Sequence, residues 1–122
     1  MTDQDIIFKP VAGLRVLSTR QVVRDIPALF YAAAEALHRH RVPYREGRWI
    51  ALYHDEGFDR VDLEVGVVVP DDYGQPVPLA GGGQMTVREL PPVRRMACLT
   101  HRGGYNDLCW TYRSFWRWLE ER

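Results

Sequence analysis

The order of the predicted elements in this 122-residue chain indicates an α+β fold, in which an antiparallel sheet carries two helices on one face. Leu14–Val23 resembles a strand and is followed by an amphipathic helix that opens at Asp25 and by two more strands. Gln84–His101 also has strand-like character and precedes a second amphipathic helix, Tyr105–Glu120. The repeated order predicts a duplicated strand-helix-strand-strand module, the second copy incomplete, with a cleft between the two halves. Clefts of this kind are where small ligands commonly bind.

The first helix has clear start and stop signals. Asp25 is a good N-cap and Pro27 suits the first helical turn. Pro43 is expected to end the helix. Apolar residues recur at i, i+3, i+4 and i+7 spacing, which predicts one buried stripe. The stripe consists of Ile26, Leu29, Phe30, Ala33 and Leu37.

Two strands, Arg48–His54 and Val61–Val69, are expected to form a hairpin around the glycine-containing loop Asp55–Asp59. The second of them alternates most regularly, so its residues divide between two faces of the sheet. One face carries Val61, Leu63, Val65, Val67 and Val69. The other carries Asp62, Glu64, Gly66 and Val68.

The chain length predicts a single domain over 1–122, with module one at about 10–70, a linker at 71–83 and module two at 84–122. Pro70–Gly83 contains three prolines and four glycines, which favour a loop. Gln84–Leu90 and Pro92–His101 are the expected strands of the second module.

The last helix, Tyr105–Glu120, is rich in aromatic residues. Its spacing predicts a buried face that includes Trp116, with Trp110 and Trp118 toward the polar side. The chain ends where a matching second module would continue into two more strands. Either the chain is a fragment of a longer protein or something else completes the sheet.

Composition excludes several classes of function. The 16 basic and 16 acidic residues give a formal net charge of zero, which argues against direct nucleic-acid contact by this segment. Cys98 and Cys109 are expected to be packing residues in a reducing environment. The N-terminus lacks signal-peptide character and no apolar run has membrane-spanning length. We therefore expect a cytoplasmic protein with no membrane association.

Glu64 is the strongest candidate for a functional residue, because it lies in the middle of the most apolar strand. One interpretation is a solvated outer face, as in any one-sided antiparallel sheet. The other is a carboxylate that binds an organic cation among aromatic side chains, whose ring faces attract cations. The candidate aromatic walls are Tyr53, Tyr105, Trp110 and Tyr31.

No metal or cofactor is expected. His38 and His40 are two residues apart and would point to different faces of a helix. His54 with its two acidic neighbours would form a metal site only if the loop geometry happened to suit. The chain contains no phosphate-binding loop, dinucleotide fingerprint or serine-nucleophile motif.

Two parts of the chain resemble the GyrI-like (gyrase-inhibitor-like) effector-binding domains. The segment VRELPPVRRMACLTHRGGYNDLCWTYRSFWRWLEER shows the pattern of a strand with Leu-Pro, a strand ending in His-x-Gly-x-Tyr, and a helix with a late Trp-Leu. The segments VLSTRQVVRDIPALF, YHDEG and VDLEVGVVV are similar to the first half of the same domains. The resemblance covers nearly the whole chain.

The resemblance implies paired βαββ modules about a pseudo-twofold axis with a ligand cleft between them. Such domains serve as the sensing part of MerR-type and AraC-type transcription regulators or as free-standing proteins. It implies that Glu64 is the cleft acid, that Tyr53 precedes His-Asp as in the family, and that Tyr105 is the tyrosine of His-x-Gly-x-Tyr. Family members continue past the late Trp-Leu into a hairpin that carries another acid, whereas this chain ends at Arg122. An unpaired sheet edge would favour a homodimer.

The resulting expectation is a domain that binds a small lipophilic effector, with lipophilic cations among the candidates. One alternative is a hydrolase that opens strained rings in natural products, with Glu64 as general acid or base and Tyr105 positioning water. Another is a protein-interaction module of the gyrase-inhibitor type, for which Trp110 and Trp118 are the candidate surface.

Overall fold

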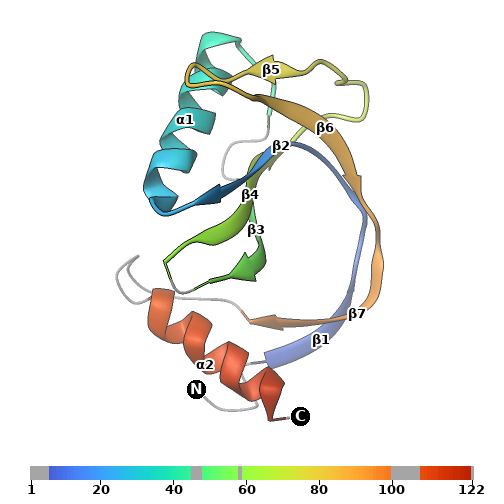
Figure 1. The fold of residues 1–122 in the computed structure, drawn as a ribbon. Helices are drawn as coiled ribbons and strands as arrows, with labels where there is room; N and C mark the ends of the chain where they lie inside the picture. The colour runs from blue at the N-terminus through green and yellow to red at the C-terminus, as the bar shows by residue number, and fades with distance from the viewer. Residues whose placement is uncertain (1–5, 45–47, 58, 100–107, 122) are drawn as a thin grey trace. The chain divides into compact units, whose positions relative to one another are not determined.

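A computed structural model describes residues 6–44, 48–57, 59–99 and 108–121, without the side chains of Glu56, Leu108, Cys109, Trp110 and Tyr112. It confirms an α+β fold with antiparallel strand pairing and two helices (Figure 1). Neither of these helices is both long and apolar enough to cross a membrane. The chain divides into two compact units, one of residues 13–91 and one of residues 1–12 with 92–122.

The larger unit is built on a five-stranded antiparallel sheet in the order β3-β4-β2-β6-β5. The long strand β2 lies at its centre and pairs with β4 on one side and with β6 on the other. The strands are β2 (Leu14–Val23), β3 (Trp49–Glu56), β4 (Val61–Val68), β5 (Val77–Pro78) and β6 (Gln84–Leu90).

Helix α1 (Ile26–Arg39) begins and ends much as the sequence predicts. The backbone N–H of Ala28 donates a hydrogen bond of 3.0 Å to the Asp25 carboxylate, which confirms Asp25 as the N-cap. Beyond the last turn, Arg41 adopts a left-handed backbone with a φ of 52°, and the next N–H, of Val42, reaches back 3.1 Å to the carbonyl of Leu37. These contacts close the helix before Pro43.

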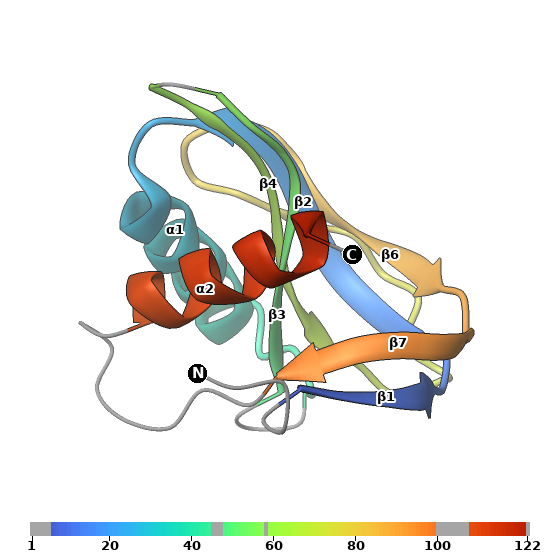
Figure 2. The ribbon, with the colours of Figure 1, turned by 90° about the horizontal axis from the view of Figure 1, so that it is seen from below.

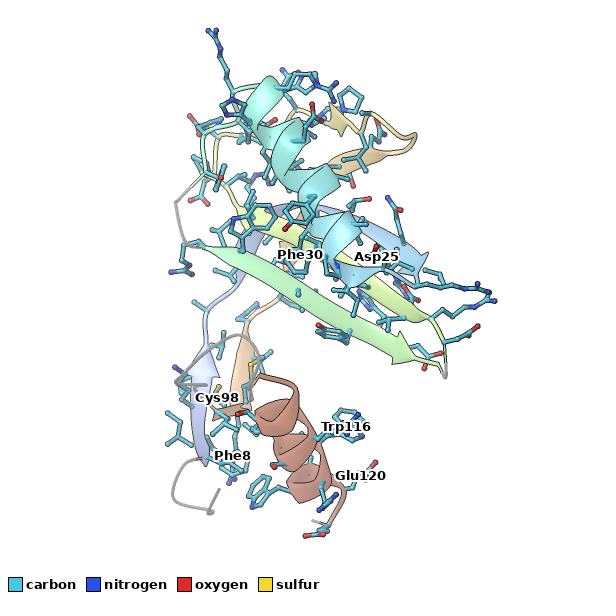
Figure 3. All side chains as sticks on the ribbon, turned by 90° about the vertical axis from the view of Figure 1, so that its left-hand side faces the viewer. Phe8, Asp25, Phe30, Cys98, Trp116 and Glu120 are labelled. Carbon is cyan, nitrogen blue, oxygen red and sulfur yellow. The ribbon has the colours of Figure 1, made fainter. Side chains whose placement is uncertain are left out.

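One face of the five-stranded sheet is covered by α1 (Figures 1 and 2). Ala33 and Ala36 are fully buried, and their small side chains let the helix approach the sheet closely. Phe30 lies on the side of the helix toward the sheet (Figure 3), with its ring centroid 6.0 Å from that of Trp49. The core beneath the helix includes Leu17, Leu29, Leu37, Leu63, Val65, Val67 and Met85. Removing this apolar surface from water provides the main driving force for folding of the unit.

Strand β3 continues two residues beyond the predicted end at His54. A register shift between Tyr53 and Asp55 produces a bulge, in which His54 and Asp55 together oppose Asp62. Asp55 therefore belongs to the strand and not to the loop. The hairpin closes instead through a hydrogen bond of 2.8 Å from the N–H of Gly57 to the carbonyl of Arg60.

The smaller unit contains a strand that the sequence analysis did not predict. β1 (Ile6–Val11) pairs antiparallel with β7 (Val93–Leu99), and α2 (Leu108–Glu120) belongs to the same unit. Pro10 weakened the strand signal of β1, because proline cannot donate to a ladder. The structure accommodates Pro10 at a register shift between Lys9 and Val11.

The missed strand changes which face of α2 is buried. Trp116, expected in the core, is 54% exposed and lies on the side of α2 away from the β1–β7 ribbon (Figure 3). Trp118, expected toward the polar side, is half-buried, with its ring centroid 6.0 Å from that of Phe8 on β1. The prediction for these two tryptophans was wrong because it did not include Phe8 as a packing partner.

The expected duplication of βαββ modules stays a prediction. β6, which was placed in the second module, pairs directly with β2 in the larger unit. The two-residue strand β5 lies within the segment 71–83 that was expected to be a linker.

Candidate functional site

Glu64 lies in β4 on the face of the five-stranded sheet opposite α1, yet it is only 3% exposed. Its neighbours across the ladders are Arg20 on β2 and Leu52 on β3. The face assignment predicted from alternation is therefore consistent with the register, because Leu63 and Val65 on either side belong to the core under the helix. A solvated outer position for Glu64 does not fit this burial.

Three side chains from three other strands bind the Glu64 carboxylate. The Ser18 hydroxyl on β2 donates to Oε2 at 2.6 Å, and Nε of Arg88 on β6 donates to the same oxygen at 3.0 Å. Nε2 of His54 on β3 lies 2.8 Å from Oε1. We call Ser18, His54, Glu64 and Arg88 the Glu64 cluster. Among the described residues, no buried side-chain nitrogen or oxygen lacks a hydrogen-bond partner.

The backbone around the cluster explains how four strands bring these groups together. Gly66 pairs with Ser18, and a Cβ at Gly66 would lie 2.3 Å from the Leu17 carbonyl oxygen and 2.6 Å from Ser18 Cβ. Glycine is therefore needed where β2 and β4 approach each other above Ser18. On the other side of β4, the bulge in β3 presents His54 to Glu64. Bulges next to functional sites often redirect a side chain in this way.

The cluster keeps Glu64 ionised despite its burial. Burial by itself raises the pKa of the carboxyl, but hydrogen bonds from Ser18 and His54 and the charge of Arg88 outweigh it and lower the pKa below the usual value. An ionised carboxylate can only accept hydrogen bonds, so Nε2 of His54 must carry the proton it shares with Oε1. Glu64 thereby fixes the orientation and tautomer of the His54 ring.

A second ionic pair lies beside the cluster on the same two central strands. Arg20 donates from Nε and from a terminal nitrogen to the two oxygens of Asp62, at 2.9 and 2.8 Å. This bidentate hydrogen bonding lowers the pKa of Asp62. The Arg20 side chain is 55% exposed, so the pair is solvated, whereas the Glu64 cluster is closed around its carboxylate.

Apolar side chains surround the polar centre of this face. Ile50 and Leu52 on β3, Val68 on β4 and Leu90 on β6 are all half-buried, and their ladder partners place them on the side of Glu64. We call the Glu64 cluster and these four apolar residues the Glu64 face. It combines a charged centre with an apolar border, which is the usual chemistry of a small-molecule site.

The predicted aromatic walls are not assembled around Glu64 in the part of the chain that the structure describes. Tyr53 pairs with Leu63, so its side chain lies on the face toward α1 and is 40% exposed. Tyr31 is 76% exposed on α1 itself. Tyr105 and the side chain of Trp110 lie outside the described residues. The structure instead brings together Glu64, Ser18, His54 and Arg88. Of these, the sequence analysis named only Glu64 as a ligand-binding residue, and it considered His54 only as a metal ligand.

A groove of about 590 Å³ lies elsewhere in the larger unit. It is lined by the start of α1, the end of β2 and the turn around Gly81, together with Arg60. None of the Glu64 cluster lines it. We choose the Glu64 face as the candidate site and not this groove, because the buried, hydrogen-bonded carboxylate lies on that face.

The described residues contain no group of three or more His, Cys, Asp or Glu side chains placed to bind a metal ion. The cluster contains one carboxylate and one imidazole, with the guanidinium of Arg88 on the same carboxylate. Such an arrangement is suited to hydrogen bonding and proton transfer.

Comparison of the chain with known protein families, curated proteins and solved structures gives no match.

Proposed function

We propose that this chain is a small-molecule-binding domain and that a lipophilic organic compound binds at the Glu64 face. The observation that carries the proposal is the buried Glu64 carboxylate, bound by three strands and bordered by half-buried apolar side chains. The resemblance to GyrI-like domains supports the more specific role of effector binding, in a transcription regulator or a free-standing relative.

The energetics of a buried ionic group support a functional role for the cluster. Removing a charge from water is costly, and well-packed apolar residues of similar volume often give equal or greater stability. The Glu64 side chain is 4% exposed, while His54 and Arg88 are 23% and 47% exposed. Part of each of these two side chains is therefore accessible to a ligand, although the carboxylate that they bind is not.

The three hydrogen-bond donors around Glu64 indicate which ligand charge the site favours. The sequence analysis included an organic cation among the candidate ligands of Glu64, but the carboxylate already has a cation in Arg88 and two further donors. Adding an organic cation would require it to compete with Arg88. We therefore propose a neutral or anionic ligand with a hydrogen-bond acceptor, such as a carbonyl or phosphoryl oxygen, directed at Arg88.

The test uses three compounds of similar bulk: tetraphenylphosphonium as cation, triphenylacetate as anionic acceptor and triphenylphosphine oxide as neutral acceptor. Each is titrated into the ¹⁵N-labelled protein and followed by ¹H–¹⁵N correlation spectra. We expect saturable shifts for the neutral and anionic compounds that centre on Leu52, Val68 and Arg88. Tight binding of the cation alone would overturn the proposed ligand class, and no binding by any compound would overturn the function.

Arginine variants provide a matched control. Arg88→Gln should weaken triphenylphosphine oxide binding about tenfold, or roughly 1.4 kcal/mol. Arg39 on α1 has a similar side-chain exposure of 46%, and it pairs with Glu35 on the helix. Arg39→Gln should bind like the wild type, because Arg39 belongs to the helix that covers the opposite face.

A further inference from the structure

We infer that the His54–Glu64 pair is a general-base dyad that hydrolyses a carboxylic ester bound at the Glu64 face. The inference rests on the proposed binding function and adds a chemical step to it. Two groups carry it: an imidazole oriented by a buried carboxylate and a half-exposed guanidinium on the same carboxylate. Neither Tyr105 nor an opening of strained rings is involved.

The geometry of His54 is that of an oriented base. Its Nε2 lies 2.8 Å from Oε1 of Glu64, and the ionised carboxylate makes this nitrogen the donor. The other ring nitrogen, Nδ1, then carries a lone pair, and no described residue hydrogen-bonds to it. The His54 side chain is 23% exposed, so a water molecule can reach the ring. A carboxylate behind an imidazole also stabilises the imidazolium that forms when the ring takes a proton.

Arg88 supplies the second requirement of ester hydrolysis, a donor for the developing oxyanion. Its Nε binds Oε2 of Glu64, which fixes the guanidinium beside the carboxylate. No described residue is seen to bind its terminal nitrogens, and the side chain is 47% exposed. A carbonyl oxygen directed at these nitrogens would gain charge-assisted hydrogen bonds as negative charge accumulates on it.

The serine of the cluster is not placed as a nucleophile. The Ser18 hydroxyl donates its proton to Glu64 at 2.6 Å, and the residue is 5% exposed. Activation of serine would need a base that accepts this proton, but the lowered pKa of Glu64 makes its carboxylate a weak base. Water is therefore the attacking group, and Ser18 positions Glu64.

The proposed step balances without a further reactant. Nδ1 of His54 accepts one proton from water while the water oxygen bonds to the ester carbon. The carbonyl π pair moves onto its oxygen, beside Arg88, and gives a tetrahedral oxyanion. When the oxyanion collapses, the bond from carbon to the alcohol oxygen breaks, and the imidazolium returns a proton to that oxygen. One ester and one water give one acid and one alcohol.

The first measurement is the hydrolysis of para-nitrophenyl butyrate by the full chain. His54→Gln should lower kcat about a hundredfold or more, within the usual contribution of a general base, with little change in KM. His38→Gln is the matched control, because His38 is an exposed histidine on α1. Equal rates for the wild type and His54→Gln would overturn the inference.

A spectroscopic readout separates positioning from simple loss of structure. In ¹⁵N spectra, His54 of the wild type should show the tautomer with the proton on Nε2, and Glu64→Gln should lose this fixed preference while its backbone spectrum stays folded. A wild-type His54 with the proton on Nδ1 would overturn the dyad, because the lone pair would then face Glu64.

Binding and catalysis fail in distinguishable ways. If the ester competes with triphenylphosphine oxide but is not hydrolysed, the dyad is overturned and the binding function stands. If neither the ester nor any of the three test compounds binds, both proposals are overturned. Competition together with a rate that depends on His54 and not on His38 supports both.

Discussion

The two faces of the five-stranded sheet are built from the same strands but differ in chemistry. Toward α1, Leu63, Val65 and Val67 are fully buried in an apolar core. On the other face, Glu64 and Ser18 are 3% and 5% exposed, almost as inaccessible, but they are polar and hydrogen-bonded to each other. Burial therefore has two different roles in this sheet. At Leu63, Val65 and Val67 it provides folding free energy, and at Glu64 it holds a charge in a defined position.

Each face predicts a different response to substitution. Apolar burial contributes roughly 25 cal/mol per Å² of surface removed from water. A buried ionic cluster contributes little net stability, although removing one partner from it is costly. Variants on the α1 face should mainly alter the free energy of unfolding, and variants at the border of the Glu64 face should mainly alter ligand binding.

The largest loss of stability is expected from Leu63→Ala. Leu63 is fully buried under α1, so truncation leaves a cavity and should cost about 2–5 kcal/mol. Leu52→Ala on the Glu64 face is the matched variant, because Leu52 is only half-buried. Leu52→Ala should lower the free energy of unfolding clearly less than Leu63→Ala does, but it should weaken ligand binding. Chemical denaturation of both variants checks this, and equal losses would contradict the comparison.

Gly66→Ala is expected to cause the next largest loss of stability, about 1–3 kcal/mol in the free energy of unfolding. The added methyl group would overlap the backbone of β2 and Cβ of Ser18. The strands would have to separate, and the Ser18 hydrogen bond to Glu64 would lengthen. Gly81→Ala is the control, since a Cβ at Gly81 has no heavy atom within 4 Å. Thermal unfolding should distinguish the two, and a neutral Gly66→Ala would refute the close approach.

The contribution of Glu64 to stability should depend on pH in the acid range. Because the folded-state pKa of Glu64 is lowered, its ionisation stabilises the protein above the unfolded-state pKa of about 4.3. This stabilisation is lost as the pH falls through the folded-state pKa. At neutral pH, Glu64→Gln should be less stable than the wild type by about 1–3 kcal/mol.

Denaturation of the wild type and Glu64→Gln across the acid range tests this sign. The difference in the free energy of unfolding should shrink as the pH falls below about 4. A difference that grows toward low pH would mean that the pKa of Glu64 is raised, and that burial outweighs the three donors.

The smallest effect is expected from Asp62→Asn. The Arg20–Asp62 pair is on the same strands as Ser18 and Glu64, but it is solvated. Exposed ion pairs contribute little and are screened by salt. The variant should lose less stability than Glu64→Gln, and the loss should decrease further in high salt. If Asp62→Asn lost as much stability as Glu64→Gln, the exposed Arg20–Asp62 pair would contribute as much as the buried Glu64 cluster, which would contradict the comparison.

Local patterns predicted the larger unit well. Leu14–Val23 and Gln84–Leu90 were expected as strands and are β2 and β6 with the same bounds. The N-cap at Asp25 and the face of Glu64 were also predictable, because capping and alternation depend on a few neighbouring residues.

The cluster was not predictable in the same way, because it depends on pairing between distant strands. Arg88 reaches Glu64 only because β6 and β4 both flank β2. His54 depends on a bulge, for which the sequence carries no strong signal. The available hint was a polar residue at every second position of several strands, such as Ser18 with Arg20 and Asp62 with Glu64. The β1 strand was missed because Pro10 interrupts it.

The central claim is that the Glu64 cluster serves binding and is not needed for the fold. The most direct test is a variant in which its four residues become apolar: Ser18→Val, His54→Leu, Glu64→Leu and Arg88→Leu. Its ¹H–¹⁵N spectrum is recorded with and without triphenylphosphine oxide. We predict a dispersed, folded spectrum that the ligand no longer shifts. Loss of dispersion, or ligand shifts as large as those of the wild type, would contradict the account.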